Sequence, residues 1–170
     1  MTRERVIQSQ LLRGLRHERR CHVVTLPDGH DRRKCPYDFG VCCEGHYHAV
    51  ECKRVAGSQA SMSFKQLRAH QGYFLSQCDT YGGTAWLIVH FNHRPSRKWR
   101  KALGLPAMVH ETYAVRFRDA MYLHLEEGMS GLPYAFIREQ VAAGAEYIRP
   151  LKRVKTPQGY AWSGKGWLYG

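Results

Sequence analysis

The run of residues from Ala85 to Phe91 limits the folds open to this chain more than any other feature. It reads Ala-Trp-Leu-Ile-Val-His-Phe, without the regular alternation of apolar and polar residues that marks a strand with one face in water. Gly82 and Gly83 lie just before it. A strand of this composition is expected at the centre of a sheet, with other layers covering both of its faces. The run therefore predicts an α/β fold around a central, buried strand.

Two segments before this strand have the apolar spacing of helices. Residues 3–17 carry apolar side chains three and four positions apart, which predicts one amphipathic helix. A second helix is expected to begin at a cap within residues 61–63 and to end before Gly82. Its regularly spaced residues are Phe64, Leu67, Gln71, Phe74 and Cys78.

The second half of the chain has weaker signals. A strand is expected over residues 112–117, a short helix over 119–127 capped by Asp119, and a further helix from Pro133 to about residue 145.

The length and composition of the chain predict one domain. With 170 residues, of which 44% are hydrophobic, the chain is long enough for one buried core and too short for two ordinary domains. We expect a single domain over residues 1–170, with a core over residues 1–92 and a basic, aromatic extension over residues 93–170. That extension is expected to turn at residues 157–159.

Basic residues outnumber acidic ones. The chain has 26 Lys and Arg against 14 Asp and Glu, a formal net charge of +12. Such a balance is typical of proteins that bind nucleic acids, and a merely soluble basic surface or association with ribosomes is the alternative. No segment has the roughly 20 apolar residues of a membrane helix, so a cytoplasmic protein without a membrane partner is expected. The residues expected to contact DNA are Arg32, Arg33, Lys34, Arg54, Lys65, Arg97, Lys98, Arg100 and Lys101.

The six cysteines do not have the spacing of a secreted disulfide scaffold. We expect free thiols in a reducing compartment. A zinc site is the alternative, because several cysteines and histidines lie between Cys35 and Cys52. It is not favoured, since the chain has no C-x-x-C pair and a strand sends neighbouring side chains to opposite faces.

The segment around Glu44-Gly45 has the pattern of a β-hairpin. Residues 37–43 and 46–54 are rich in strand-forming residues and flank this pair, which suits a two-residue turn. Such a turn would pair Cys43 with His46 and so fix the register of the two strands.

That register would place three charged side chains on one face of the hairpin. Asp38 falls directly opposite Glu51, and Lys53 projects from the same face. His46 and His48 fall on the opposite face, where we expect them to pack rather than bind a ligand. Like charges directly opposite each other destabilise a hairpin, so the two carboxylates need a counter-charge.

A divalent cation would provide that counter-charge. Mg²⁺, or Mn²⁺ in its place, binds oxygen ligands and keeps several waters, so Asp38, Glu51 and the main-chain carbonyl of Cys52 would be sufficient protein ligands. Such an ion activates water for phosphodiester hydrolysis, and Lys53 could steady the developing charge. The alternative is a surface hairpin with a ladder of salt bridges, because a lone Glu-x-Lys is common.

Short stretches between residues 35 and 92 carry a more specific signal through their order and spacing. They are Tyr37-Asp38-Phe39-Gly40-Val41, Gly45-His46-Tyr47, Glu51-Cys52-Lys53, Ser63-Phe64, His70-Gln71, Gly82-Gly83 and the strand from Trp86 to Phe91. Together they closely resemble the RecU-type Holliday junction resolvases of the PD-(D/E)XK nuclease superfamily.

The resemblance implies a restriction-endonuclease-like core, with a mixed central sheet flanked by helices, and Mg²⁺-dependent nicking of four-way DNA junctions by a homodimer. It makes Asp38 and Glu51 metal ligands, Lys53 the catalytic lysine and Gln71 a supporting glutamine. Glu4, followed four residues later by Gln8, matches the first-helix acid of these nucleases.

Two other functions remain open at this point. One is a PD-(D/E)XK nuclease that acts on flaps, single strands or duplex DNA. The other is a DNA-binding protein of the same fold without catalytic activity.

Overall fold

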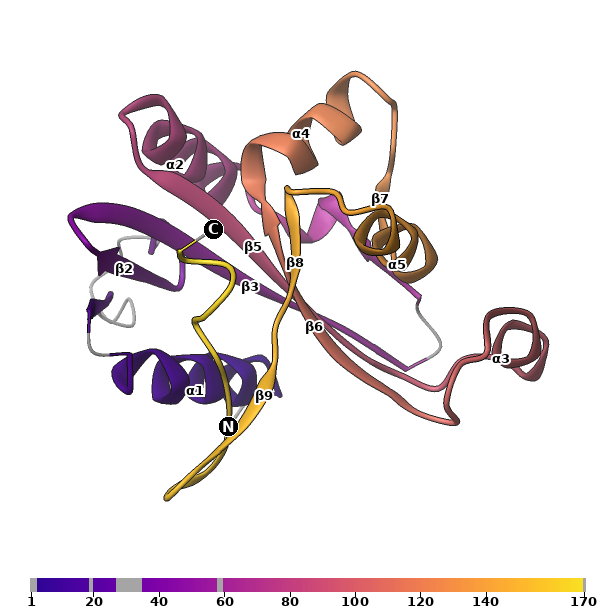
Figure 1. Ribbon diagram of the computed structural model, residues 1–170. Coiled ribbons are helices and arrows are strands. Elements are labelled where there is room, and N and C mark those ends of the chain that lie inside the picture. Colours follow the sequence, from indigo (N-terminus) through magenta and orange to yellow (C-terminus); the bar gives the residue numbers. More distant parts are fainter. Residues whose placement is uncertain (1–2, 19, 27–34, 58–59, 170) are drawn as a thin grey trace.

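A six-stranded mixed sheet forms the centre of the computed structural model (Figure 1). The structure describes residues 3–18, 20–26, 35–57 and 60–169, without the side chains of Arg3, Glu4 and Leu103. The strands of the sheet are, in spatial order, β1 (Cys21–Thr25), β2 (Phe39–Cys43), β3 (His46–Gly57), β5 (Thr84–His93), β6 (Val109–Arg116) and β8 (Ile148–Pro150). Strands β3 and β5 run parallel, and the other neighbours are antiparallel.

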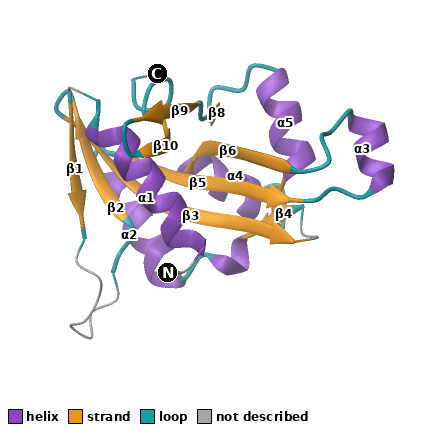
Figure 2. Ribbon diagram, turned by 90° about the horizontal axis from the view of Figure 1, so that it is seen from below, coloured by secondary structure: helices purple, strands orange, loops and turns teal. Residues whose placement is uncertain are grey.

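Helices and two short pairs of strands complete the fold (Figure 2). The helices are α1 (Arg3–Arg16), the 3₁₀ helix η1 (Phe64–Gln66), α2 (Ala69–Thr80), α3 (Arg97–Leu103), α4 (Phe117–Leu125) and α5 (Tyr134–Ala142). The remaining strands form two pairs, β4 (Ser61–Ser63) with β7 (Gly131–Pro133), and β9 (Arg153–Thr156) with β10 (Gly159–Trp162). The predicted turn at residues 157–159 is confirmed, because it connects β9 to β10.

The predicted central strand is confirmed as β5. Leu87, Ile88 and Val89 are all fully buried, although they point alternately to the two faces of the sheet. Burying one such side chain stabilises the folded state by about 1.5–3 kcal/mol. The strand is therefore placed where its apolar composition contributes most.

A hydrophobic layer covers each face of the sheet. On one face α2, α4 and α5 pack on the core through residues such as Leu75, Phe117 and Ile137. On the other face Leu11 of α1 packs with Trp167 of the C-terminal segment. Figure 1 shows these two layers above and below the strands. The predicted arrangement of a mixed sheet flanked by helices is confirmed.

The predicted hairpin turn is also confirmed. Glu44 and Gly45 both have positive φ, 51° and 83°, as a two-residue turn of type I′ requires. Cys43 pairs with His46 and Phe39 with Val50, which is the predicted register. Asp38 comes just before β2 and therefore lies across from Glu51.

Several predicted helix boundaries are wrong. Residues 61–63 form strand β4, and α2 begins only at Ala69, because the segment between them pairs with β7 and then forms η1. Leu75 is the buried residue of α2, whereas Phe74 is 42% exposed.

The two later helices begin one or two residues from their predicted first residues. Asp119 lies in the first turn of α4 and is not its cap. Pro133 caps α5 and does not lie within its first turn.

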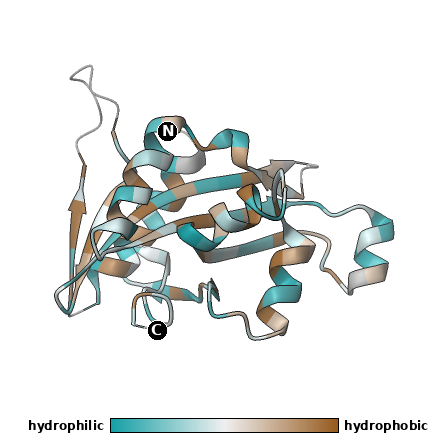
Figure 3. Cartoon of the chain, turned by 90° about the horizontal axis from the view of Figure 1, so that it is seen from above, coloured by the Kyte–Doolittle hydropathy of each residue, from teal (hydrophilic) through white to brown (hydrophobic). Residues whose placement is uncertain are grey.

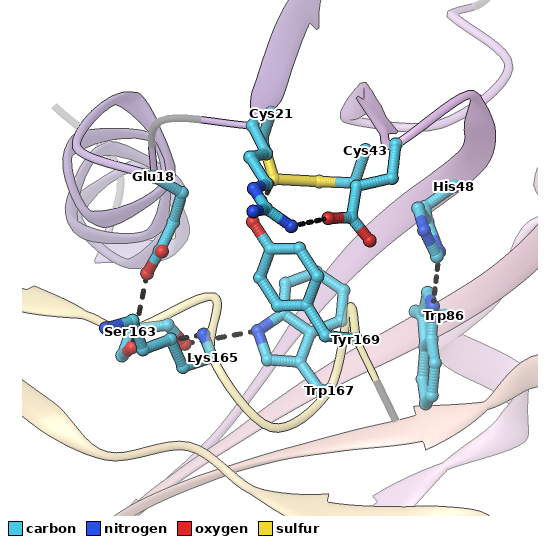
Figure 4. The surroundings of a disulfide bond; sticks show 11 residues. Glu18, Cys21, Cys43, His48, Trp86, Ser163, Lys165, Trp167 and Tyr169 are labelled. Carbon is cyan, nitrogen blue, oxygen red and sulfur yellow. Dashed lines mark hydrogen bonds and ion pairs between the residues drawn. A yellow bond between two sulfur atoms is a disulfide. The ribbon is translucent and has the colours of Figure 1, made fainter.

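The expectation that all six cysteines are free thiols is wrong, since Cys21 and Cys43 form a disulfide (Figure 4). No strand was predicted over residues 21–25, yet β1 pairs there with β2 and sets these two cysteines directly opposite each other. The Tyr169 hydroxyl lies 3.0 Å from Cys21 Sγ, so the C-terminal segment packs beside the bridge. Among the other cysteines, Cys42 and Cys78 are free thiols.

In the described residues there is no helix of the length and apolar character that crossing a membrane demands.

His48 gives the fold a dependence on pH. It is 3% exposed, and its Nδ1 accepts the indole N–H of Trp86 at 3.2 Å (Figure 4). Burial, together with the neighbouring His46, lowers its pKa from 6.5 to about 4. Between these values the unfolded chain binds a proton at His48 and the folded chain does not. The stability that His48 contributes is therefore complete above pH 6.5 and is lost as the pH falls toward 4.

We predict that His48→Gln removes this part of the pH dependence. The free energy of unfolding is measured by urea denaturation at pH 7.5 and pH 5.0. The difference between wild type and variant should be about 2 kcal/mol smaller at pH 5.0 than at pH 7.5. His22→Gln, at an exposed position of β1, is the matched control and should follow wild type. An equal gap at both pH values would contradict the assignment.

Candidate active site

A polar cavity of about 460 Å³ lies between the hairpin and the start of α2. Each of its walls comes from a different part of the chain: the segment before β2, strand β3, and the segment from η1 into α2. It is lined by Cys35, Tyr37, Asp38, Glu51, Lys53, Gln66, Arg68, His70 and Gln71. Four of the predicted catalytic residues, Asp38, Glu51, Lys53 and Gln71, therefore meet in one cavity.

Glu51, Lys53 and Gln71 form a closed set of hydrogen bonds. Lys53 Nζ lies 2.6 Å from Glu51 Oε1, and Gln71 Nε2 donates to the same oxygen at 2.6 Å. Lys53 Nζ also donates to Gln71 Oε1 at 3.2 Å. Glu51 and Lys53 are 1% and 7% exposed, so this ion pair lies inside the protein and not on a surface ladder.

The Asp38 carboxylate is held beside this set by β3 and α1. The main-chain N–H of Asp38 donates to Val50 O at 3.1 Å, and Asp38 Oδ2 accepts the Cys52 N–H at 2.7 Å. Burial raises the pKa of Asp38, against the lowering effects of the Cys52 and Gln8 hydrogen bonds and the Lys53 charge. The carboxylate is thus poorly solvated in the folded protein, and a nearby cation would relieve that cost.

The oxygen atoms here fit a hard divalent cation. Mg²⁺ needs few protein ligands because it retains several waters, and two carboxylates with one carbonyl are enough. The N–H and C=O of a strand residue point to the same edge, so the Cys52 carbonyl is directed to the edge where its N–H meets Asp38. In the described part of the chain no group of three or more His, Cys, Asp or Glu side chains is arranged to bind a metal.

Helix α1 also reaches this site. Gln8 hydrogen-bonds the Asp38 side chain. Glu4 lies one helical turn before Gln8, but its side chain is outside the described residues. The predicted role of Glu4 stays a prediction.

Arg68 and His70 belong to the cavity, although the sequence reasoning did not place them in the site. Arg68 is the N-cap of α2, and its N–H donates to Gln71 Oε1 at 3.1 Å. Basic residues are unfavourable at a helix N-terminus, and the first turn of α2 has no acid to offset them. The sequence carried no signal of this placement, because the predicted helix began at residues 61–63 and kept both residues within it. Basic residues at a helix N-terminus suit the binding of an anion.

The described residues among those predicted to contact DNA lie on different parts of the molecule. Arg32, Arg33 and Lys34 lie outside the described residues. Lys65 is exposed in η1, next to Gln66 of the cavity wall. Arg54 projects from the opposite face of the sheet and lines another cavity, because it follows Lys53 on β3.

The other four predicted DNA contacts lie on α3. This helix projects from the body beyond the ends of β5 and β6 (Figures 1 and 2), and much of it is hydrophilic (Figure 3). Trp99, on the same helix, is 39% exposed. The residues concerned are Arg97, Lys98, Arg100 and Lys101.

No protein-family model matches this sequence, and a search of curated proteins finds no match.

We predict that Asp38→Asn stabilises the protein at neutral pH. Since the pKa of Asp38 is raised in the folded state, the folded chain binds its proton more tightly than the unfolded chain. Wild type therefore loses stability as the pH rises above 3.8 through the folded pKa, and the amide does not. In urea denaturation, the free energy of unfolding of the variant should exceed that of wild type by more at pH 7.5 than at pH 4.0.

Divalent cations should reverse this order. A ligand that binds only the folded chain raises its melting temperature, so Mg²⁺ or Mn²⁺ should stabilise wild type and leave Asp38→Asn unchanged. Glu139→Gln, an exposed carboxylate of α5, is the matched control and should respond like wild type. Equal stabilisation of all three proteins would contradict a cation site at Asp38.

Proposed function

We propose that this chain is a metal-dependent endonuclease that recognises DNA structure, with a restriction-endonuclease-like core. The proposal rests mainly on the convergence of Asp38, Glu51, Lys53 and Gln71 in one polar cavity, through direct hydrogen bonds. The hairpin register alone would also suit a surface salt bridge. Burial of the Glu51–Lys53 pair and its contact with a separate helix favour a functional site.

The residues of the candidate site have different roles in the proposed hydrolysis. Bound Mg²⁺, or Mn²⁺, would supply positive charge next to the phosphate and lower the pKa of a coordinated water. Asp38, Glu51 and the Cys52 carbonyl would hold that ion. The Lys53 ammonium can donate a hydrogen bond to a phosphate oxygen as negative charge develops there. Gln71 fixes the orientation of Glu51 through its 2.6 Å hydrogen bond.

Basic residues around the cavity suit a phosphodiester substrate. Arg68 and His70 line the cavity, and Lys65 is exposed nearby in η1. Cations that neutralise phosphates supply much of the affinity of proteins for DNA. The net charge of +12 and the basic helix α3 agree with a DNA partner beyond the cavity. DNA also agrees with the predicted cytoplasmic location.

Within this class we favour a Holliday junction resolvase. Many of the residues that carry the resemblance to RecU-type enzymes line the cavity or belong to strands β2, β3 and β5. A homodimer would present two such cavities, as symmetric nicking of a four-way junction requires.

We predict that Asp38→Asn and Lys53→Ala each lower the rate of DNA cleavage by about a hundredfold or more, since each removes charge stabilisation from the reacting centre. Binding of a four-way junction, measured by gel shift in EDTA, should stay within a few-fold of wild type. Lys152→Ala, at an exposed position away from the cavity, is the matched control and should cleave normally. Full cleavage by either active-site variant with Mg²⁺ present would overturn the proposal.

The substrate class is tested with four labelled DNAs: a four-way junction, a flap, a plain duplex and a single strand. With Mg²⁺ we expect paired nicks in the junction, and with EDTA no cleavage. Equal cutting of plain duplex would contradict a resolvase and favour another PD-(D/E)XK nuclease. Binding without any cutting would favour a DNA-binding protein without catalytic activity.

A further inference from the structure

A second cavity, of about 590 Å³, lies on the other face of the sheet. Its floor is formed by β3, β5 and β6, and its walls by α1 and the β9–β10 hairpin. It is separated from the candidate active site by the sheet itself, because Arg54 of this cavity follows Lys53 on β3 and points the other way. None of the residues proposed for hydrolysis lines it.

Two arginines bring positive charge to this cavity, and no acidic residue lines it among those that the structure describes. Arg54 and Arg153 line it together with His90 and His110, and none of the described residues that line it is Asp or Glu. Within the described part of the chain neither guanidinium forms an ion pair with a carboxylate. Burial, with the charges of Arg54, His110 and Arg153, lowers the pKa of His90 from 6.5 to about 4. An anion placed here would relieve this repulsion.

Neighbouring contacts hold the side chains of His90 and Arg153 in place. Arg54 and His90 are direct partners across β3 and β5, and His90 Nδ1 lies 2.7 Å from Thr112 Oγ1. The Arg153 guanidinium lies over the Tyr160 ring at 4.0 Å. A preorganised guanidinium loses less freedom when it binds an anion than a mobile one does.

Amide side chains stand beside the charged groups. Asn92 and Gln10 also line the cavity, and Gln10 Oε1 accepts the Trp162 indole N–H at 3.2 Å. The Gln10 NH₂ group therefore remains as a donor. Guanidinium groups suit a phosphate, and amides suit the polar edge of a base or a sugar hydroxyl. A volume of about 590 Å³ is within the range of small-molecule sites.

We infer that this second cavity binds a nucleotide, with the phosphate between Arg54 and Arg153 and the nucleoside toward Gln10 and Asn92. The nucleotide is either free or the 5′-phosphorylated end of a DNA strand, which share this chemistry. Binding here does not depend on the proposed nuclease activity, and it is measured without divalent cations.

Calorimetric titration in EDTA tests the inference, with thymidine 5′-monophosphate, inorganic phosphate and thymidine as probes. The monophosphate should bind, and thymidine should bind at least about tenfold more weakly, because it lacks the charged group that the arginines would bind. Arg54→Gln and Arg153→Gln should each lower the affinity for the monophosphate by about tenfold or more. Arg118→Gln, an exposed arginine of α4, is the matched control and should not.

Two further measurements separate the outcomes. Arg153 is exposed on its hairpin, so its variant keeps the test valid if Arg54→Gln fails to fold. A 5′-phosphorylated oligonucleotide that binds more tightly than the monophosphate, and loses this advantage in both variants, identifies a strand end as the ligand. Equal affinity identifies the free nucleotide.

The inference is overturned if thymidine binds as tightly as its monophosphate, or if both arginine variants bind the monophosphate like wild type. Lys53→Ala, which tests the nuclease proposal, should bind the monophosphate normally. Loss of cleavage and loss of nucleotide binding are thereby independent results.

Discussion

The parallel pairing of β3 with β5 is the constraint on which both charged cavities depend. The two strands pair continuously from His48 and Thr84 to Gly57 and His93. Because side chains alternate along a strand, β3 presents Lys53 to the α2 side of the sheet and Arg54 to the α1 side. A shift of one residue would exchange the two sets and bring apolar residues out of both cores. The hydrophobic pattern of β3 therefore fixes where its charges point.

Helix α1 connects the two sides of this arrangement. Gln8 contacts Asp38 at the edge of the candidate active site, and Gln10 contacts Trp162 in the second cavity. Between α1 and β10 the backbones approach so closely that a Cβ on Gly14 would lie 1.8 Å from Trp162 O. Only glycine permits this contact. Helix α1 thus contacts both the C-terminal hairpin and the edge of the candidate active site.

The parts of the fold that local sequence determines were predictable. The turn at Glu44-Gly45 sets the hairpin register, so the opposition of Asp38 and Glu51 followed from counting residues, and the apolar composition of β5 marked it as central. Strand β1 was missed because its pairing with β2, and hence the Cys21–Cys43 disulfide, depends on a contact across a long connection. The second cavity was missed for the same reason.

Helix α2 shows why tertiary contacts override a periodic pattern. The spacing from Phe64 to Cys78 suits one continuous helix, but residues 61–63 pair with β7 and the α-helix begins later. This break places Arg68 and His70 beside the cavity, at the start of α2. One continuous helix would have placed them in the middle of the helix. The sequence carried the basic residues, and only the fold showed which space they face.

The Glu51–Lys53 pair is poorly explained by stability alone. Moving two charges out of water costs several kcal/mol for each ion, and replacing a buried pair by apolar residues of similar volume is often neutral or stabilising. Here the pair lies at 1% and 7% exposure in the most continuous part of the sheet, where valine or leucine would pack without that cost. Its hydrogen bonds to Gln71 orient the carboxylate toward a polar cavity and not toward the core. A buried charge pair that faces a polar cavity supports the proposed catalytic role more than a role in folding.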